Sequence, residues 1–217
     1  MSQQALFRLS AVALMVTGVS LALGNILHPV HPFPAASIAS SQWAVAHFLW
    51  WLGGLGGMVG LTGLYLRQRG ELGAIGFVGS ALAVVGCALI ASAMYFEAFI
   101  APALASRAPE LFQSYPAGGG WEGFLVAVLA SGALFGAGFL IFGIAMLRRG
   151  SMPSWAIVLA VGGGVPFAVN FLLPYPVAIL AAVTFAAGLL GLGYALWISV
   201  KQLAGHSSTA AANSSNR

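Results

Sequence analysis

Residues 25–34 read NILHPVHPFP and residues 43–51 read WAVAHFLWW, with long aliphatic runs on both sides. This stretch contains three of the four histidines of the chain and half of its six tryptophans. Its prolines cannot continue an α-helix, whereas residues 43–51 begin a new apolar run. The stretch is therefore predicted to be a turn at a membrane face, where one transmembrane helix ends and the next begins.

The composition excludes an ordinary soluble domain. Of 217 residues, 60% are hydrophobic and 6% are charged, and the mean hydropathy is +0.96, whereas roughly a quarter of the residues in soluble domains are charged. The chain is predicted to be an all-α polytopic membrane protein whose main partner is the lipid bilayer. The net charge of +4 is attributed to basic residues that fix the topology, and no nucleic-acid partner is expected.

Six apolar segments are long enough to cross a bilayer, which requires about 20 apolar residues per helix. They are predicted as helices over residues 6–27, 43–66, 72–100, 120–147, 153–173 and 176–200. Together they form a six-helix bundle over residues 1–204. Residues 205–217 are poor in apolar content and are predicted to be a disordered cytoplasmic tail.

The basic residues predict the orientation of the bundle. With six crossings both termini lie on the same side, and seven of the eight basic residues fall on that side: Arg8, Arg67, Arg69, Arg148, Arg149, Lys201 and Arg217. Since positively charged loops stay in the cytoplasm, both termini are predicted to be cytoplasmic, in a bacterial inner membrane. The histidine-rich turn and Arg107 then lie at the outer face.

The first apolar segment has an alternative interpretation as a secretory signal, since it carries a lone basic residue and the small-residue triplet at residues 22–24. The apolar run over residues 9–27 is long for the core of a signal, which typically has about 7–15 residues. Its removal would leave five crossings. A retained first helix is therefore preferred.

A weak internal repeat relates the first and fifth predicted helices. The pattern N-x-L-x-P occurs at residues 25–29 and again at residues 170–174, which places Asn25 and Asn170 at matching outer ends. Three out-and-back helical hairpins are therefore predicted, in parallel orientation, unlike the inverted repeats common in secondary transporters. Glycines at three- and four-residue spacing indicate close helix packing. The alternative is that these grooves bind a flat ligand such as a quinone, a carotenoid or a porphyrin.

The candidate site residues gather at the outer face. His28, His31, His47 and Glu97 belong to the same leaflet by topology, and His47 shares one helix face with Trp43 and Trp50. Ionisable groups inside a bilayer are costly and suggest function. Three imidazoles and a carboxylate are suitable ligands for zinc or another divalent metal, and His28 and His47 are the candidate axial ligands of a haem. The simpler alternative is that His47 and Glu97 are hydrogen-bonded interfacial groups.

Three further polar residues are candidates, namely Asn25, Asn170 and Glu122. Glu122 opens the fourth helix, where a carboxylate complements the helix dipole. Asn170 follows Pro166, which should kink the fifth helix, and it would lie near a substrate path if the protein were a transporter. The single cysteine, Cys87, lies in an apolar run and is predicted to be a small buried side chain.

No motif specifies a reaction. The chain contains no aspartate, and it lacks a phosphate-binding Walker loop, a G-x-S-x-G elbow and an H-E-x-x-H pair. The favoured prediction is a protein without a catalytic centre, either an accessory subunit of other membrane proteins or a binder of a lipophilic small molecule. The alternatives are a small redox or metal protein that uses the outer histidines, and a small-solute transporter.

Overall fold

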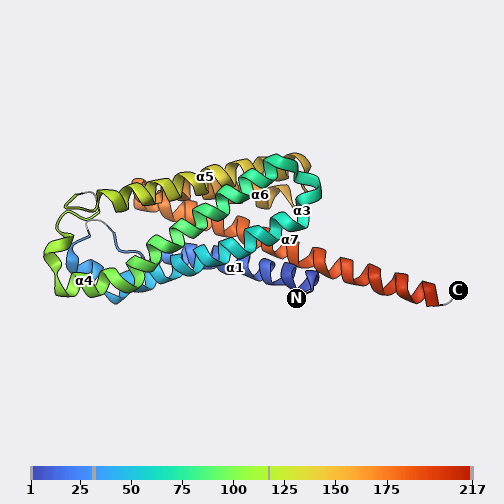
Figure 1. Ribbon diagram of the computed structural model, residues 1–217, viewed down its shortest axis with the longest axis horizontal. Helices are drawn as coiled ribbons and strands as arrows, with labels where there is room; N and C mark the ends of the chain where they lie inside the picture. Colours follow the sequence, from blue (N-terminus) through green and yellow to red (C-terminus); the bar gives the residue numbers. More distant parts are fainter. Residues whose placement is uncertain (1, 31–32, 117, 216–217) are drawn as a thin grey trace.

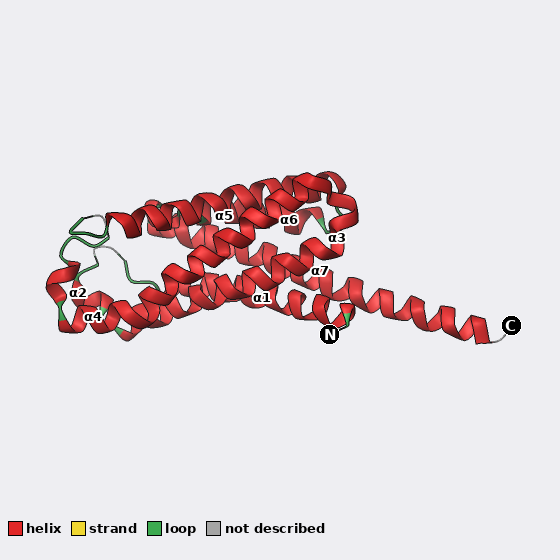
Figure 2. Ribbon diagram, in the orientation of Figure 1, coloured by secondary structure: helices red, strands yellow, loops and turns green. Residues whose placement is uncertain are grey.

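The computed structural model describes residues 2–30, 33–116 and 118–215, with only the backbone described from residue 201 onward. Its described residues form helices and no strand, and 87% of the chain is helical, as Figure 2 shows. The elements in chain order are α1 (Gln3–Leu27), α2 (Ala35–Ile38), α3 (Ser41–Tyr95), the π-helix η1 (Phe96–Ile100), α4 (Ala101–Arg107), the 3-10 helix η2 (Pro109–Phe112), α5 (Glu122–Arg149), α6 (Ser154–Phe167), the 3-10 helix η3 (Asn170–Leu172) and α7 (Tyr175–Ser215). The all-helical prediction is confirmed.

Helix α3 folds back on itself at Gly73, so that two predicted helices are the limbs of one element. Gly73 has φ 60° and ψ −159°, a conformation that glycine adopts far more readily than any residue with a Cβ atom. The two limbs run side by side, since the rings of Tyr65 and Phe77 lie 5.9 Å apart and Gly57 packs against Cys87. Figure 1 shows the turn at the end of the bundle opposite α4. We call residues 41–72 the first limb and residues 74–95 the second limb.

The bundle consists of antiparallel helix pairs that meet through glycines. Helix α1 packs on the first limb of α3, the second limb packs on α5, and α6 packs on α7. At each seam a Cβ atom added to a glycine would collide with the neighbouring helix: Gly60 with Leu14, Gly86 with Phe135, Gly163 with Phe185 and Gly188 with Ala160. Small residues that let backbones approach are typical of helix packing in membranes.

Four of the described helical segments are long and apolar enough to cross a membrane, namely Gln3–Leu27, Ser41–Arg107, Glu122–Arg149 and Tyr175–Val200. These segments indicate a membrane helical bundle. Helix α6 has 14 residues and is shorter than the predicted helix over residues 153–173. It ends one residue after Pro166, because proline lacks the N–H that a continuing helix requires and obstructs the preceding turn.

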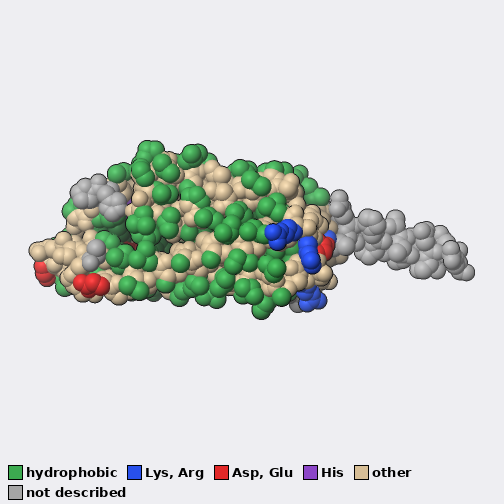
Figure 3. Space-filling view, turned by 90° about the horizontal axis from the view of Figure 1, so that it is seen from above, with side chains coloured by type: hydrophobic (Ala, Val, Ile, Leu, Met, Phe, Trp, Pro, Cys, Tyr) green, Lys and Arg blue, Asp and Glu red, His purple; other side chains and the backbone are tan. Residues whose placement is uncertain are grey.

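Charged side chains mark the two ends of the bundle. In Figure 3 basic side chains gather at one end, with acidic atoms beside them, and acidic side chains lie at the opposite end. The face in this view is hollowed towards the acidic end.

At that end a small cap closes the bundle. The cap comprises α2, α4 and η2, which pack around Trp43 and bury Ile38, Ala105 and Phe112.

Helix α7 continues beyond the bundle as far as Ser215, and Figure 1 shows this extension projecting away from the other helices. An isolated helix that packs against nothing is marginal in water. The predicted disorder of residues 205–217 therefore stays a prediction, and Asn216 and Arg217 lie outside the described residues.

Candidate functional site

A cavity of about 450 Å³ lies beneath the cap, between α1, α3, α5, the segment that follows α6, and α7. This volume is within the range of about 300–1,000 Å³ that is typical of small-molecule sites. Five of the seven polar residues singled out from the sequence line it: Asn25, His28, His47, Glu97 and Asn170. The structure therefore brings together residues that lie up to 145 positions apart in the chain.

The two imidazoles form part of an aromatic cluster at the cavity wall. The ring centroids of His28 and His47 lie 5.0 Å apart. The ring of Trp50 stacks on His28 at 4.9 Å, and the ring of Trp43 stacks on His47 at 4.3 Å. The predicted shared face of Trp43, His47 and Trp50 supplies three of these four rings, and the turn after α1 supplies His28.

Backbone carbonyls fix the tautomers of both histidines. Nδ1 of His47 lies 2.8 Å from the carbonyl oxygen of Trp43, and Nδ1 of His28 lies 2.8 Å from that of Pro29. A carbonyl oxygen can only accept a hydrogen bond, so each Nδ1 carries the proton and donates. In the neutral ring the lone pair is then on Nε2.

Glu97 lies in the π-helix η1 and is 2% exposed. The indole Nε1 of Trp43 donates to Oε2 of this carboxylate at 3.2 Å, and the hydroxyl of Tyr115 donates to Oε1. One donor comes from the start of α3 and the other from the loop before α5, so Glu97 joins that loop to the start of α3. Single π-helical turns occur frequently at functional sites.

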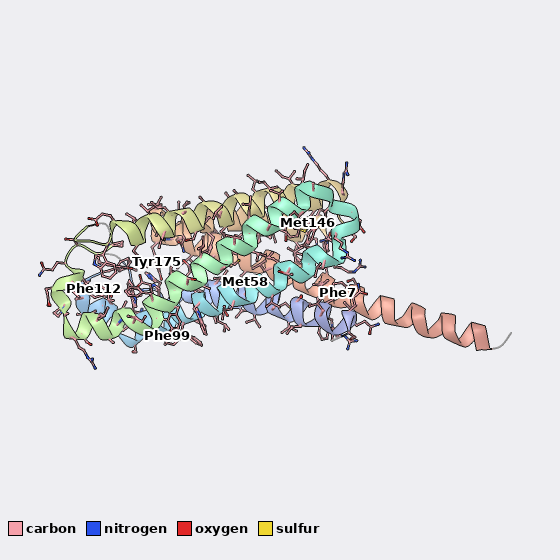
Figure 4. All side chains as sticks on the ribbon, in the orientation of Figure 1. Phe7, Met58, Phe99, Phe112, Met146 and Tyr175 are labelled. Atoms are coloured by element: carbon pink, nitrogen blue, oxygen red, sulfur yellow. The ribbon has the colours of Figure 1, made fainter. Side chains whose placement is uncertain are left out.

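The two asparagines of the sequence repeat are hydrogen-bonded to each other. Nδ2 of Asn170 donates to Oδ1 of Asn25 at 3.4 Å, and Nδ2 of Asn25 donates to the carbonyl oxygen of Leu21 at 3.4 Å. Close by, the hydroxyl of Tyr175 donates to the carbonyl oxygen of Ile26 at 3.0 Å. These bonds join the end of α1 to the segment between α6 and α7, and Figure 4 shows Tyr175 towards the same end as Phe112.

The rest of the wall is largely apolar. The second limb, α5 and the segment around η3 supply these side chains, which include Ile90, Met94, Leu125, Val128, Phe167 and Phe171. A site of this type holds an apolar body along most of its surface and a polar group at one side.

Two candidate residues are not placed in the cavity. Glu122 lies exposed in the first turn of α5 and is not part of the cavity lining. His31 lies outside the described residues, and the metal prediction that includes it stays a prediction. Among the residues that are described, no group of three histidine, cysteine, aspartate or glutamate side chains could hold a metal ion.

The haem prediction also stays a prediction, and it depends on the separation of the two imidazole rings. His28 and His47 would hold the iron of a haem, which would supply redox chemistry at this wall. The rings are in direct contact at an interplanar angle of 61°. They would have to separate before a haem could enter.

Sequence reasoning did not identify Tyr115 or Ser131, which also line the cavity. Tyr115 lies in a loop without a recognisable motif, and only its hydrogen bond to Glu97 reveals its place. Ser131 lies in the middle of an apolar helix, where a lone hydroxyl is a weak signal.

Comparison of the chain with protein-family models, with curated proteins and with solved structures gives no match.

Proposed function

We propose that this protein binds a lipophilic small molecule in the cavity beneath the cap and catalyses no reaction of its own. The observation that carries the proposal is the cavity of about 450 Å³, which has largely apolar walls and polar groups gathered at one side. Such a site fits an apolar body with one polar head group. The protein would act as a carrier of this molecule, or present it to other membrane subunits as an accessory partner.

The proposed topology is a six-pass protein of a bacterial inner membrane with cytoplasmic termini. The basic end of the bundle supports this orientation, since positive charge favours the cytoplasmic side. Helix α6 spans roughly 21 Å at 1.5 Å per residue, which is less than the bilayer core of about 30 Å. The irregular segment after it, residues 168–174, would complete the crossing. Irregular backbone is tolerated at membrane depth where it lines a cavity, as this segment does.

That interrupted helix also supports the transporter as a second candidate. Broken helices at the binding site are a recurring feature of secondary transporters. Here the break after Phe167 places Asn170 at the cavity wall. The two candidates share the binding site and differ in whether the bound molecule crosses the membrane.

The test uses full-length protein purified in mild detergent, with the lipophilic compounds that co-purify extracted and identified by mass spectrometry. Val128→Phe fills the cavity from α5. Val126→Phe makes the same change on the same helix at a side chain that is 64% exposed and outside the cavity lining. We expect a compound that is retained by the wild type and the Val126 variant and depleted at least tenfold in the Val128 variant.

Equal retention by both variants would refute cavity binding. A Soret absorption band or a stoichiometric metal in the same preparation would instead favour the redox or metal alternative. Flux of the identified compound into vesicles that contain the reconstituted protein would establish the transporter.

A further inference from the structure

Most side-chain hydrogen-bond donors of the cavity wall are already used within the protein. The ring N–H groups of His28, His47 and Trp43 and the hydroxyls of Tyr115 and Tyr175 donate to the protein acceptors given above. The indole of Trp50 donates to the carbonyl oxygen of Leu21 at 3.3 Å, and the hydroxyl of Ser131 donates to that of Ala127 at 2.5 Å. Among the side-chain donors of the described lining residues, only the second N–H of each asparagine amide has no such bond.

The hydrogen-bond acceptors of the cavity wall can accept further hydrogen bonds. The neutral ring of His47 keeps a lone pair on Nε2, since its proton is on Nδ1. Each oxygen of Glu97 accepts one hydrogen bond, and a carboxylate oxygen offers about two lone-pair sites. The oxygen Oδ1 of Asn170 is a further acceptor. The described cavity lining contains no arginine or lysine.

We propose, on the basis of the binding function above, that the molecule in this cavity carries a head group that donates hydrogen bonds, a hydroxyl or a protonated amine. A hydroxyl donates to Nε2 of His47, and the oxygens of Glu97 and Asn170 are further acceptors on the same wall. A carbonyl oxygen carries lone pairs and no proton, so it cannot form a hydrogen bond with these acceptors. Burying an acceptor without a partner costs free energy. Among the side-chain donors, only the second N–H of Asn25 and of Asn170 could donate to a carbonyl, whereas His47, Glu97 and Asn170 all offer acceptors, so the cavity takes a lipophilic hydroquinone in preference to the corresponding quinone.

The decisive comparison uses decylubiquinol and decylubiquinone, which share one tail and differ by two hydrogen atoms on the head group. Their binding to the full-length protein in detergent is measured by anaerobic titration calorimetry. We expect the quinol to bind at least tenfold more tightly. 1-Dodecanol and dodecylamine, compared with 2-dodecanone, then distinguish a neutral hydroxyl from an ammonium as the preferred donor.

Two variants test whether His47 and Glu97 cause the preference for the quinol. His47→Phe removes the Nε2 acceptor and keeps a ring, so the quinol should lose affinity while the quinone keeps its own. A merely structural role for His47 would weaken both probes equally. Glu97→Gln adds an amide donor to the wall and should improve quinone binding, whereas Glu122→Gln is the matched control outside the cavity.

The outcomes separate the two proposals. If the quinone binds as tightly as the quinol, and 2-dodecanone binds as tightly as 1-dodecanol, the proposed donor head group is wrong. The proposal of lipophilic binding then still stands. A failure of all five probes to bind overturns both. Tighter binding of dodecylamine than of 1-dodecanol supports a donor head group and identifies it as an ammonium.

Discussion

Two adjacent glycines of α6 provide a direct test of the close helix packing. A Cβ atom on Gly163 would fall on the backbone of α7, 2.7 Å from the Cα atom of Phe185 and 2.7 Å from the carbonyl oxygen of Ala181. A Cβ atom on Gly162 would meet nothing within 4 Å. The substitutions Gly163→Ala and Gly162→Ala therefore add the same methyl group to the same helix, once inside the contact and once outside it.

The two variants should differ in stability by an amount that reflects the helix contact alone. Alanine in place of glycine favours a helix by about 1 kcal/mol at either position, so this gain cancels in the comparison. Separating α6 from α7 at the contact costs about 1–3 kcal/mol, as overpacking typically does. We expect Gly162→Ala to be slightly more stable than the wild type and Gly163→Ala to be less stable than Gly162→Ala by about 1–3 kcal/mol.

The single cysteine supplies the assay. Cys87 is free and 2% exposed, so a thiol-reactive fluorescent dye labels it only when the bundle opens. Each kcal/mol should move the midpoint of thermal unfolding by about 2–4 °C in a chain of this size. Equal midpoints for the two alanine variants would refute the close backbone contact between α6 and α7.

Three further changes test the cavity and the opposite end of the bundle. Tyr115→Phe removes one of the two donors to the Glu97 carboxylate and should lower the free energy of unfolding by about 1 kcal/mol; a difference below about 0.3 kcal/mol would show that the bond contributes nothing. Gly24→Ala would place a methyl group 2.6 Å from Nε1 of Trp50, so it should displace the indole and weaken decylubiquinol binding at least threefold in calorimetry, and unchanged affinity would contradict this. Gln68 is 1% exposed, and within the described part of the chain its amide has no hydrogen-bond partner. Gln68→Met should therefore be neutral or stabilising in the dye assay, and a clear loss of stability would show that the amide is satisfied.

The helices were predictable because hydropathy reports on long apolar segments directly. A chain reversal between the predicted helices over residues 43–66 and 72–100 was expected, but its position at Gly73 was not predictable, because a glycine with positive φ leaves no trace in an apolar average and the helical hydrogen bonding continues almost unbroken on both sides. The early end of α6 had a visible cause in Pro166, but sequence alone does not distinguish a kink from a stop.

The location of the site was predictable from topology, whereas its chemistry was not. In the predicted topology the first helix ends, the second begins and the third ends at one face, which brings His28, His47 and Glu97 to that face, and the structure places all three at the same cavity. The tautomers depend on two backbone carbonyls. The surroundings of Glu97 depend on Tyr115, which lies 18 positions away in the chain. Contacts of this kind arise from packing and have no sequence pattern.

The π-helix at Phe96–Ile100 makes the direction of the Glu97 side chain depend on the number of residues in this segment. A π-helical turn contains one residue more than an α-helical turn, and each residue of an α-helix rotates the side-chain direction by about 100°. Deleting one residue between positions 96 and 100 would let the backbone return to a continuous α-helix, but Glu97 or the whole of α4 would then face another side. At this segment the number of residues, and not only their identity, determines whether the carboxylate faces the cavity.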